Sequence, residues 1–271
     1  MELLRAALKN DPTVTLDVAA LEMATIEYAD LKPEPYLSAL DGIANGIESR
    51  LHEHADGPRF IETANDCLFD ELGLRGNEAD YYDPKNSCLN AVLDRRLGIP
   101  ITISVVYMEV SRRLRRPVFG IGLPGHFIVQ YDDDAYNTFI DPFHGGKLLN
   151  HEDCRLLAKD IGGVELSADP TLLRPVRNQQ ILIRMLNNLR AAYFRSKNYS
   201  KAVKALDLLI ESSPDAADHY KARAFAHMHL KELLAARGDF DMYLRCSPEA
   251  ADRAEIAKHL EAIHRWLGSV N

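Results

Sequence analysis

The residue pair with the clearest chemical potential is His126 and Asp141. Residues 126–131 and 136–140 have the composition of two short strands, and three aspartates at 132–134 separate them as a turn. In an antiparallel hairpin with this turn, the histidine and the aspartate lie at the same open end. A carboxylate on one imidazole nitrogen orients the ring and fixes its tautomer, as in thiol and serine hydrolases. The alternative is a histidine that only holds a loop through a hydrogen bond.

Catalysis by this pair requires a nucleophile, and Cys88 is the candidate. It lies near the start of a predicted helix, where the helix N-terminus would lower its pKa and favour the thiolate. The alternative is a buried structural cysteine, because cysteine is among the most buried residue types. The sequence leaves both interpretations of Cys88 open.

A third interpretation is a metal site formed by His126, Asp141 and His144, because nitrogen and oxygen ligands bind zinc or iron. The hairpin already accounts for the first two residues, so we expect no metal ion and no cofactor. Gly120–Gly125 matches the GxGxxG pattern of dinucleotide sites, but a strand pattern follows it where such a site has a helix. We therefore interpret the segment as a bend that brings the backbone close to the neighbouring helix.

The elements that must position these residues are helical before the hairpin. The first 80 residues have mostly helical spacing of apolar side chains. A helix is predicted to begin at Asn86 or Ser87 and to end at Gly98, and a buried helix to begin at Pro100. Asp80–Asp83 precedes both helices. We interpret it as a turn and a helix cap whose tyrosines pack on the core, with the rim of a cleft as the alternative.

The C-terminal part contains an internal repeat. Pro214 and Pro248 recur at a period of about 34 residues, and Ala202 and Ala236 recur at the same offset. Small residues at a helix crossing and proline at the exit are typical of tetratricopeptide (TPR) repeats, although a plain helical bundle is the alternative. Residues 251–267 are predicted to cap the last repeat.

Composition narrows the class of protein. The 271 residues carry a net charge of −8, which argues against nucleic-acid binding. The four cysteines form no CxxC pair, so free thiols in a reducing compartment are expected. We find neither a signal-peptide pattern nor a membrane-length apolar run, and we expect a cytoplasmic protein. The basic cluster at residues 112–116 is interpreted as the solvated end of a helix.

Four segments together resemble the bacterial SirB-type transglutaminase-like/TPR family. The resemblance extends from about residue 30 to the C-terminus, and the segments are Asp80–Ser87, Leu93–Pro100, Gly122–Phe127 and Ile140–Gly146. The resemblance implies an α+β fold: a transglutaminase-like (papain-like) core with N-terminal helices and a C-terminal all-α TPR-like domain.

The resemblance also implies a catalytic order of Cys, His and Asp. His126 and Asp141 match the second and third positions of that order. The nucleophile position falls between Pro100 and Ser104, where there is no cysteine. Thr102 and Ser104 are poor substitutes, because a hydroxyl needs more activation than a thiol.

These observations predict three regions and two candidate functions. The regions are an N-terminal helical region packed on the core (1–79), the transglutaminase-like core (80–176) and TPR-like repeats with a capping helix (177–271). The leading hypothesis is a non-catalytic or weakly catalytic binding or regulatory module, with a protein or peptide partner on the repeats and no nucleic-acid or membrane partner. The alternative is an active cysteine hydrolase, amidase or acyl transferase that uses Cys88, His126 and Asp141.

Overall fold

The chain forms two compact units, Met1–Met185 and Leu186–Asn271. The structure is a computed structural model that describes residues 1–52, 55–165 and 173–270. This division places the predicted N-terminal region and the predicted core in one unit. Within the described ranges, no helix combines the length and the apolar character that a membrane span requires.

The N-terminal part of the first unit is helical, as the apolar spacing predicts. Its helices bury apolar faces, and the side chains of Leu4, Leu40 and Phe60 are fully enclosed. This burial is the main source of their stability, because short helices are marginal in isolation. The elements are α1 (Glu2–Leu8), α2 (Leu16–Ala24), α3 (Glu34–Glu48), α4 (Gly57–Asn65) and the π-helical turn η1 (Asp66–Glu71).

The central helix α6 (Pro100–Arg113) begins at the proline that the sequence indicates. It packs against α2 and α3 as well as against the main sheet, which explains why apolar residues occupy nearly all its sides. The predicted cap of the preceding helix is wrong. α5 (Leu89–Arg95) has Cys88 at its N-cap, because a 3-10 turn, η2 (Pro84–Ser87), comes first and is capped by Asp83.

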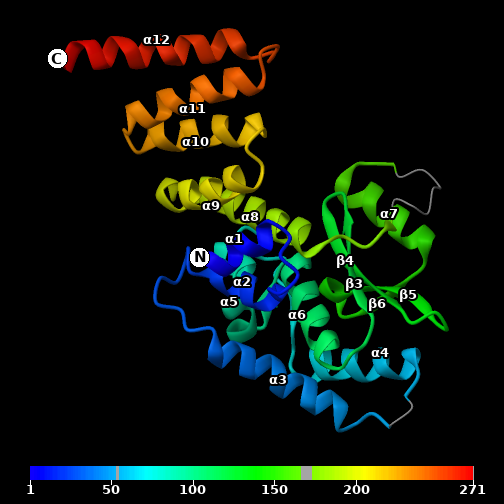
Figure 1. The fold of residues 1–271 in the computed structure, drawn as a ribbon. Coiled ribbons are helices and arrows are strands. Elements are labelled where there is room, and N and C mark those ends of the chain that lie inside the picture. Colours follow the sequence, from blue (N-terminus) through cyan, green and yellow to red (C-terminus); the bar gives the residue numbers. More distant parts are fainter. Residues whose placement is uncertain (53–54, 166–172, 271) are drawn as a thin grey trace. The chain divides into compact units, whose positions relative to one another are not determined.

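The main sheet is a four-stranded antiparallel meander in the order β3-β4-β5-β6. The predicted hairpin is its centre, and α6 and α7 lie on opposite sides of the sheet (Figure 1). A second, two-stranded parallel sheet joins β1 (Arg75–Gly76) to β2 (Leu97–Gly98). The remaining elements of this region are β3 (Val118–Leu123), β4 (His126–Asp132), β5 (Asn137–Asp141), η3 (Pro142–His144), β6 (Lys147–Leu149) and α7 (His151–Gly162).

The glycine-rich segment is mostly strand, which corrects its interpretation as a bend. Gly120 lies in β3, and it must be glycine because a Cβ there would come within 2.8 Å of the Phe127 ring on β4. The bend is confined to the turn at Gly125, whose φ is +71°. There the expected approach to a helix is present, since a Cβ on Gly125 would lie 3.0 Å from the Cα of Gly162 in α7.

The basic cluster at residues 112–116 is not simply a solvated helix end. Arg113 is 14% exposed and ion-pairs with Asp17, which is 1% exposed, at 2.7 Å. The same guanidinium contacts Glu109 at 3.2 Å and Asp41 at 2.6 Å. Burial, followed by the charge of Asp17, raises the pKa of Glu109 to about 7. Arg113 therefore holds the N-terminal helix α2 to the central helix through buried charges.

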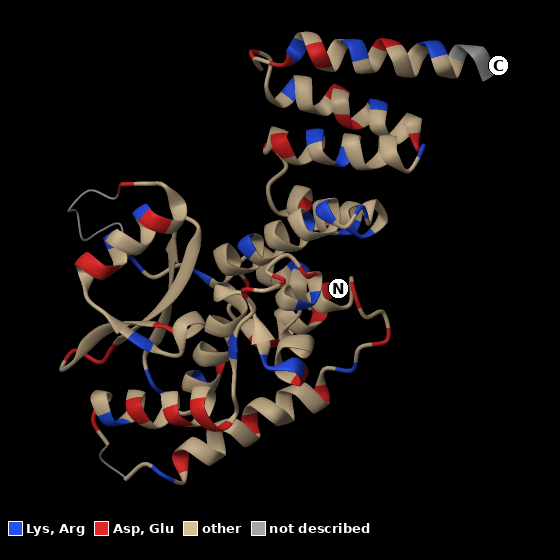
Figure 2. Cartoon of the chain, turned by 180° about the vertical axis from the view of Figure 1, so that it is seen from behind, with Lys and Arg blue, Asp and Glu red and all other residues tan. Residues whose placement is uncertain are grey.

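The second unit has the helical hairpins that the repeat predicts. Ala202 and Ala236, the small residues of the repeat, are fully buried. Arg223 stands where the first repeat has the buried Leu189, and it pairs with Asp239 at 2.7 Å. Basic and acidic residues alternate along the capping helix (Figure 2). The helices are α8 (Asn178–Arg195), which begins in the first unit, α9 (Tyr199–Ser212), α10 (Ala217–His229), α11 (Leu233–Cys246) and α12 (Arg253–Val270).

Candidate functional site

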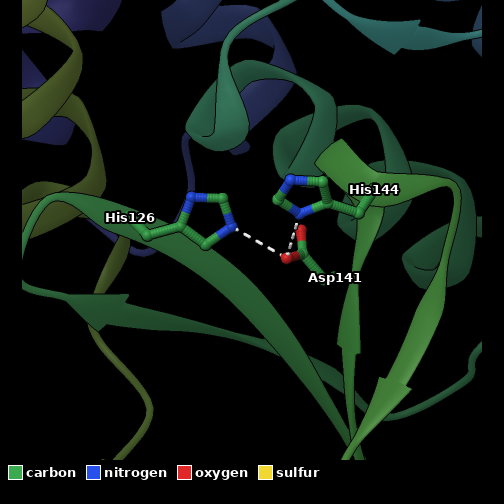
Figure 3. Close-up of side chains that lie close together, drawn as sticks. All are labelled: His126, Asp141 and His144. Atoms are coloured by element: carbon green, nitrogen blue, oxygen red, sulfur yellow. Dashed lines mark hydrogen bonds and ion pairs between the residues drawn. The ribbon is translucent and has the colours of Figure 1, made fainter. Parts of the chain in front are cut away.

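The hairpin brings His126 and Asp141 into contact. His126 is the first residue of β4 and Asp141 is the last residue of β5, and the antiparallel register pairs Val129 with Ile140 between them. His126 Nε2 lies 3.0 Å from Asp141 Oδ2 (Figure 3). The two side chains are buried, each 2% exposed. The contact that the residue spacing predicts is therefore present, in a region from which water is largely excluded.

A second histidine uses the same carboxylate oxygen. His144 Nδ1 lies 2.7 Å from Asp141 Oδ2, and this imidazole is 41% exposed (Figure 3). An ionised carboxylate only accepts hydrogen bonds, so each ring must donate its N–H. His126 is then protonated on Nε2 and His144 on Nδ1. In its neutral form, each ring keeps a lone pair on its other nitrogen.

The carboxylate of Asp141 stays ionised despite its burial. Its Oδ1 accepts a hydrogen bond from the backbone N–H of Phe143 at 3.1 Å. Burial opposes ionisation, but hydrogen bonds and charge from His126, and then from His144, hold the pKa of Asp141 below its usual value. The cluster is consequently a buried anion whose hydrogen-bonding capacity is satisfied from three sides.

Aromatic side chains cover His126. The Phe143 ring meets the His126 ring edge-on, with centroids 5.9 Å apart, and Tyr81 meets Phe143 in the same way at 6.4 Å. Gly76 in β1 makes room for this ring, because a Cβ there would lie 2.5 Å from it. Tyr81 and Tyr82 are 37% and 49% exposed. The predicted cap is present, with Asp83 capping η2, and Tyr81 packs on Phe143, but both tyrosines are partly exposed and so also form the rim that was the alternative.

Arg184 of α8 fixes the turn that carries His126. Its Nη2 donates to the backbone carbonyls of Leu123 at 2.9 Å and His126 at 2.7 Å. Its guanidinium also lies over the Phe127 ring, 5.5 Å from the centroid. Burial lowers the pKa of Arg184. These bonds close the turn between β3 and β4 from outside, and nothing local in the sequence indicates them.

Cys88 lies in the core. It is 0% exposed, and its thiol donates a hydrogen bond to the backbone carbonyl of Pro84, with Sγ and O 3.5 Å apart. Among the described residues, the group of possible metal ligands whose atoms lie within 4.8 Å of one another comprises His126, Asp141 and His144, and Cys88 is not a member. The structure therefore unites two of the three predicted catalytic residues, His126 and Asp141, with His144, the third candidate metal ligand, and it leaves Cys88 apart.

Comparison with known proteins identifies the relatives of this chain. Residues 34–187 match the transglutaminase-like superfamily, and residues 189–261 match the tetratricopeptide repeat. A UPF0162 protein of Xylella fastidiosa (strain 9a5c) is 34% identical over 254 residues, which cover 93% of this chain and 90% of that protein. The chain belongs to the UPF0162 family of transglutaminase-like proteins.

Other relatives extend this assignment. A UPF0162 protein of Vibrio cholerae is 27% identical over 251 residues, which cover 92% of this chain and 87% of that protein. Human F-box only protein 21 is 30% identical over 196 residues, which cover 68% of this chain and 30% of that protein. The predicted α+β fold with a TPR region is thus confirmed, whereas the SirB-type name stays a prediction.

At the expected nucleophile position, this UPF0162 protein has two buried hydroxyls. Thr102 is 0% exposed and its hydroxyl donates to the backbone carbonyl of Asn86 at 2.6 Å. Ser104 is also 0% exposed, and its Oγ lies 3.5 Å from the carbonyl oxygen of Phe127. Both side chains act as links between α6 and its neighbours, so neither is presented to a substrate.

A further thiol is in electrostatic contact with the cluster. Cys154 of α7 is 0% exposed and packs with Ile128 and Phe139 of the sheet. Burial, and to a lesser extent the charges of Asp153 and Asp141, raises the pKa of Cys154 to about 12. A raised pKa suppresses the thiolate, which is the opposite of what a nucleophile needs.

Sequence reasoning undervalued His144 and missed Phe143, Gly76 and Arg184. His144 follows Asp141 by three residues across the 3-10 turn η3, which is the spacing that places side chains on one side of a turn. That spacing was the available signal for His144. Gly76 and Arg184 are far from the hairpin in sequence, and only tertiary packing brings them to it.

Proposed function

We propose that this UPF0162 protein is a protein- or peptide-binding module whose transglutaminase-like unit does little or no thiol chemistry. The observation that carries the proposal is the full burial of the Cys88 side chain, with its thiol donating to the Pro84 carbonyl. A thiol nucleophile must be exposed enough to reach a substrate, and it must ionise. A carbonyl acceptor stabilises the protonated thiol, and burial excludes the substrate.

The burial of the His126–Asp141 pair supports the same function. His126 and Asp141 are each 2% exposed, beneath Phe143 and His144. In this arrangement the pair holds the end of the hairpin to η3. What the first unit offers to a partner is the surface above the pair, where Tyr81 and Tyr82 are exposed. Exposed tyrosines supply large contact area at low entropic cost.

The repeat unit supports binding through a groove of its own. A hollow of about 500 Å³ lies between α8 and α10, with Phe194 and Phe225 as its aromatic residues and Arg190 and Lys221 as its cations. Asp218 also lines this hollow, and Lys221 already pairs with Asp252 at 3.2 Å, so the two cations are partly balanced by the chain's own carboxylates. We propose that the partner segment is extended and places an apolar side chain between the phenylalanines.

We also propose a cytoplasmic location. None of the four cysteines is in a disulfide, and Cys67, Cys88 and Cys154 are buried. Free thiols persist in reducing compartments, which supports this location.

The alternative function, an active cysteine hydrolase, draws its support from the contact between His126 and Asp141. In that mechanism the Cys88 thiolate attacks an amide carbonyl while His126 transfers the proton and Asp141 orients the ring. Two experiments on Cys88 separate the alternatives.

We expect Cys88 in the folded protein to react with iodoacetamide on the order of 100-fold more slowly than a free thiol peptide, because alkylation requires local opening. Mass spectrometry of timed digests measures this rate, and the partly exposed Cys246 serves as the internal control. Full reaction of Cys88 in denaturant confirms that the site can be detected. Alkylation of Cys88 as fast as Cys246 would contradict the proposal.

The matching activity measurement compares the wild type with Cys88→Ser. Hydrolysis of p-nitrophenyl acetate should be equal in the two proteins within about twofold. A loss of about 100-fold or more on substitution would establish the hydrolase instead.

A further inference from the structure

We propose that His126, Asp141 and His144 form a binding site for one divalent transition-metal ion, for which zinc is the probe. The sequence offered these three residues as a less favoured alternative to a simple hydrogen-bonded pair, and the structure brings all three together. The ligand atoms of the three residues lie within 4.8 Å of one another. Two imidazoles and one carboxylate are a donor set suited to zinc and to iron(II), and not to magnesium or calcium, which prefer oxygen ligands.

The distances fit a metal centre after a small adjustment. Metal–ligand bonds of about 2.0–2.2 Å in a tetrahedral arrangement place neighbouring ligand atoms on the order of 3.3 Å apart. The two nitrogen–oxygen separations, 3.0 Å from His126 and 2.7 Å from His144, are slightly shorter. Both rings point at one oxygen, so their lone pairs converge there once the N–H protons have left (Figure 3). The ion is accommodated when both nitrogens move away from the oxygen and, from a separation of up to 4.8 Å, toward each other.

Both imidazoles can become metal ligands by changing tautomer, without gaining or losing a proton overall. On metal binding, the proton on His126 Nε2 moves to Nδ1, and the proton on His144 Nδ1 moves to Nε2, by exchange with water. Each ring stays neutral, and the nitrogen that faced Asp141 becomes the ligand. His144 Nε2 belongs to a side chain that is 41% exposed, so its new N–H can donate to solvent.

The surroundings hold the ligands and leave an entry path. Asp141 Oδ1 is already fixed by the backbone N–H of Phe143, which leaves Oδ2 for the ion. The Phe143 ring lies edge-on to both imidazoles, at 5.9 Å from His126 and 5.2 Å from His144. Two ligands are buried and His144 is 41% exposed, so solvent reaches the cluster from the side of His144 and can supply a fourth ligand. Three protein ligands with one open position are typical of catalytic zinc centres.

This inference is independent of the proposed function, since it requires neither Cys88 nor a partner. Untagged protein, freed of metal with a chelator and dialysed, is titrated with zinc chloride by isothermal calorimetry. We expect one zinc per chain with a Kd of about 1 µM or tighter. His144→Ala should weaken zinc binding about 100-fold, because it removes a direct ligand from an exposed position where the fold tolerates the change.

The control variant is His151→Ala. His151 lies on the same unit and contacts Phe139 at 5.1 Å between ring centroids, outside the cluster, so its substitution should leave zinc binding unchanged. A spectroscopic readout accompanies the titration: nitrogen-15 spectra should show His126 changing from the Nε2–H to the Nδ1–H tautomer when zinc is added. Binding of less than one zinc, or an affinity of His144→Ala within tenfold of the wild type, would overturn the proposal. Equal zinc binding by Cys88→Ser separates this result from the thiol question.

Discussion

Replacing Arg113 by methionine should lower the free energy of unfolding of the first unit by about 3–5 kcal/mol at pH 8, because it leaves the buried carboxylate of Asp17 without its closest counter-charge and removes one of the two arginines that contact Glu109. Arg113 is 14% exposed, and its partners Asp17 and Glu109 are 1% and 4% exposed. Urea unfolding followed by circular dichroism measures the loss. Arg112→Met is the comparison variant: this arginine contacts the same carboxylates, Glu109 at 2.7 Å and Asp17 at 3.4 Å, but it is 48% exposed, so we expect a smaller loss of about 1 kcal/mol.

The free energy of unfolding that Arg113→Met loses should be larger at high pH than at low pH. Glu109 has a raised pKa, about 7 against an ordinary value of 4.5, so its contribution to stability is present below pH 4.5 and is lost as the pH rises through 7. Burial opposes the ionisation of Asp17, but hydrogen bonds from Thr15 and Arg113 hold its pKa below the ordinary value. Without Arg113, both carboxylates protonate more readily. The defect of Arg113→Met should therefore shrink between pH 8 and pH 5.5, and a defect that is equal at both pH values, or equal to that of Arg112→Met, would contradict this account.

Asp141→Ala should destabilise the first unit by about 2–5 kcal/mol, because it leaves the buried N–H of His126 and the backbone N–H of Phe143 without an acceptor. Asp141 is 1% exposed, so water cannot readily replace the carboxylate. The control is His144→Ala, which removes a 41% exposed partner and should cost about 1 kcal/mol or less. Thermal and urea unfolding of the three proteins measure both differences. Equal losses in the two variants would mean that the carboxylate does not hold the end of the hairpin.

The elements that the sequence predicts well depend on local patterns. Pro100 marks the start of α6, and the three aspartates at 132–134 mark the turn between β4 and β5. Both are local signals: the missing N–H of proline and the turn preference of aspartate. The contact between His126 and Asp141 follows from the same hairpin, so two of the three residues of the cluster could be placed together from spacing alone.

The features that the sequence did not predict depend on distant contacts. Gly120 suggested a bend, but it is a strand residue whose missing side chain makes room for Phe127. Arg113 suggested a solvated helix end, because its partner Asp17 is 96 residues away. The burial of Cys88 depends in the same way on the residues that pack around η2. The spacing of apolar residues along the sequence does not indicate this packing. Secondary-structure propensity describes each helix or strand by itself. The environments of Gly120, Arg113 and Cys88 are instead determined by the other elements that pack against them.

The measurement that tests the account most directly is the tautomeric state of the two imidazoles in metal-free protein. Long-range proton–nitrogen-15 correlation spectra distinguish protonation on Nδ1 from protonation on Nε2. We predict that His126 carries its proton on Nε2 and His144 on Nδ1, and that both signals shift in Asp141→Asn. A His126 ring protonated on Nδ1, or two rings that average freely between tautomers, would show that one carboxylate does not hold both histidines and would contradict the account.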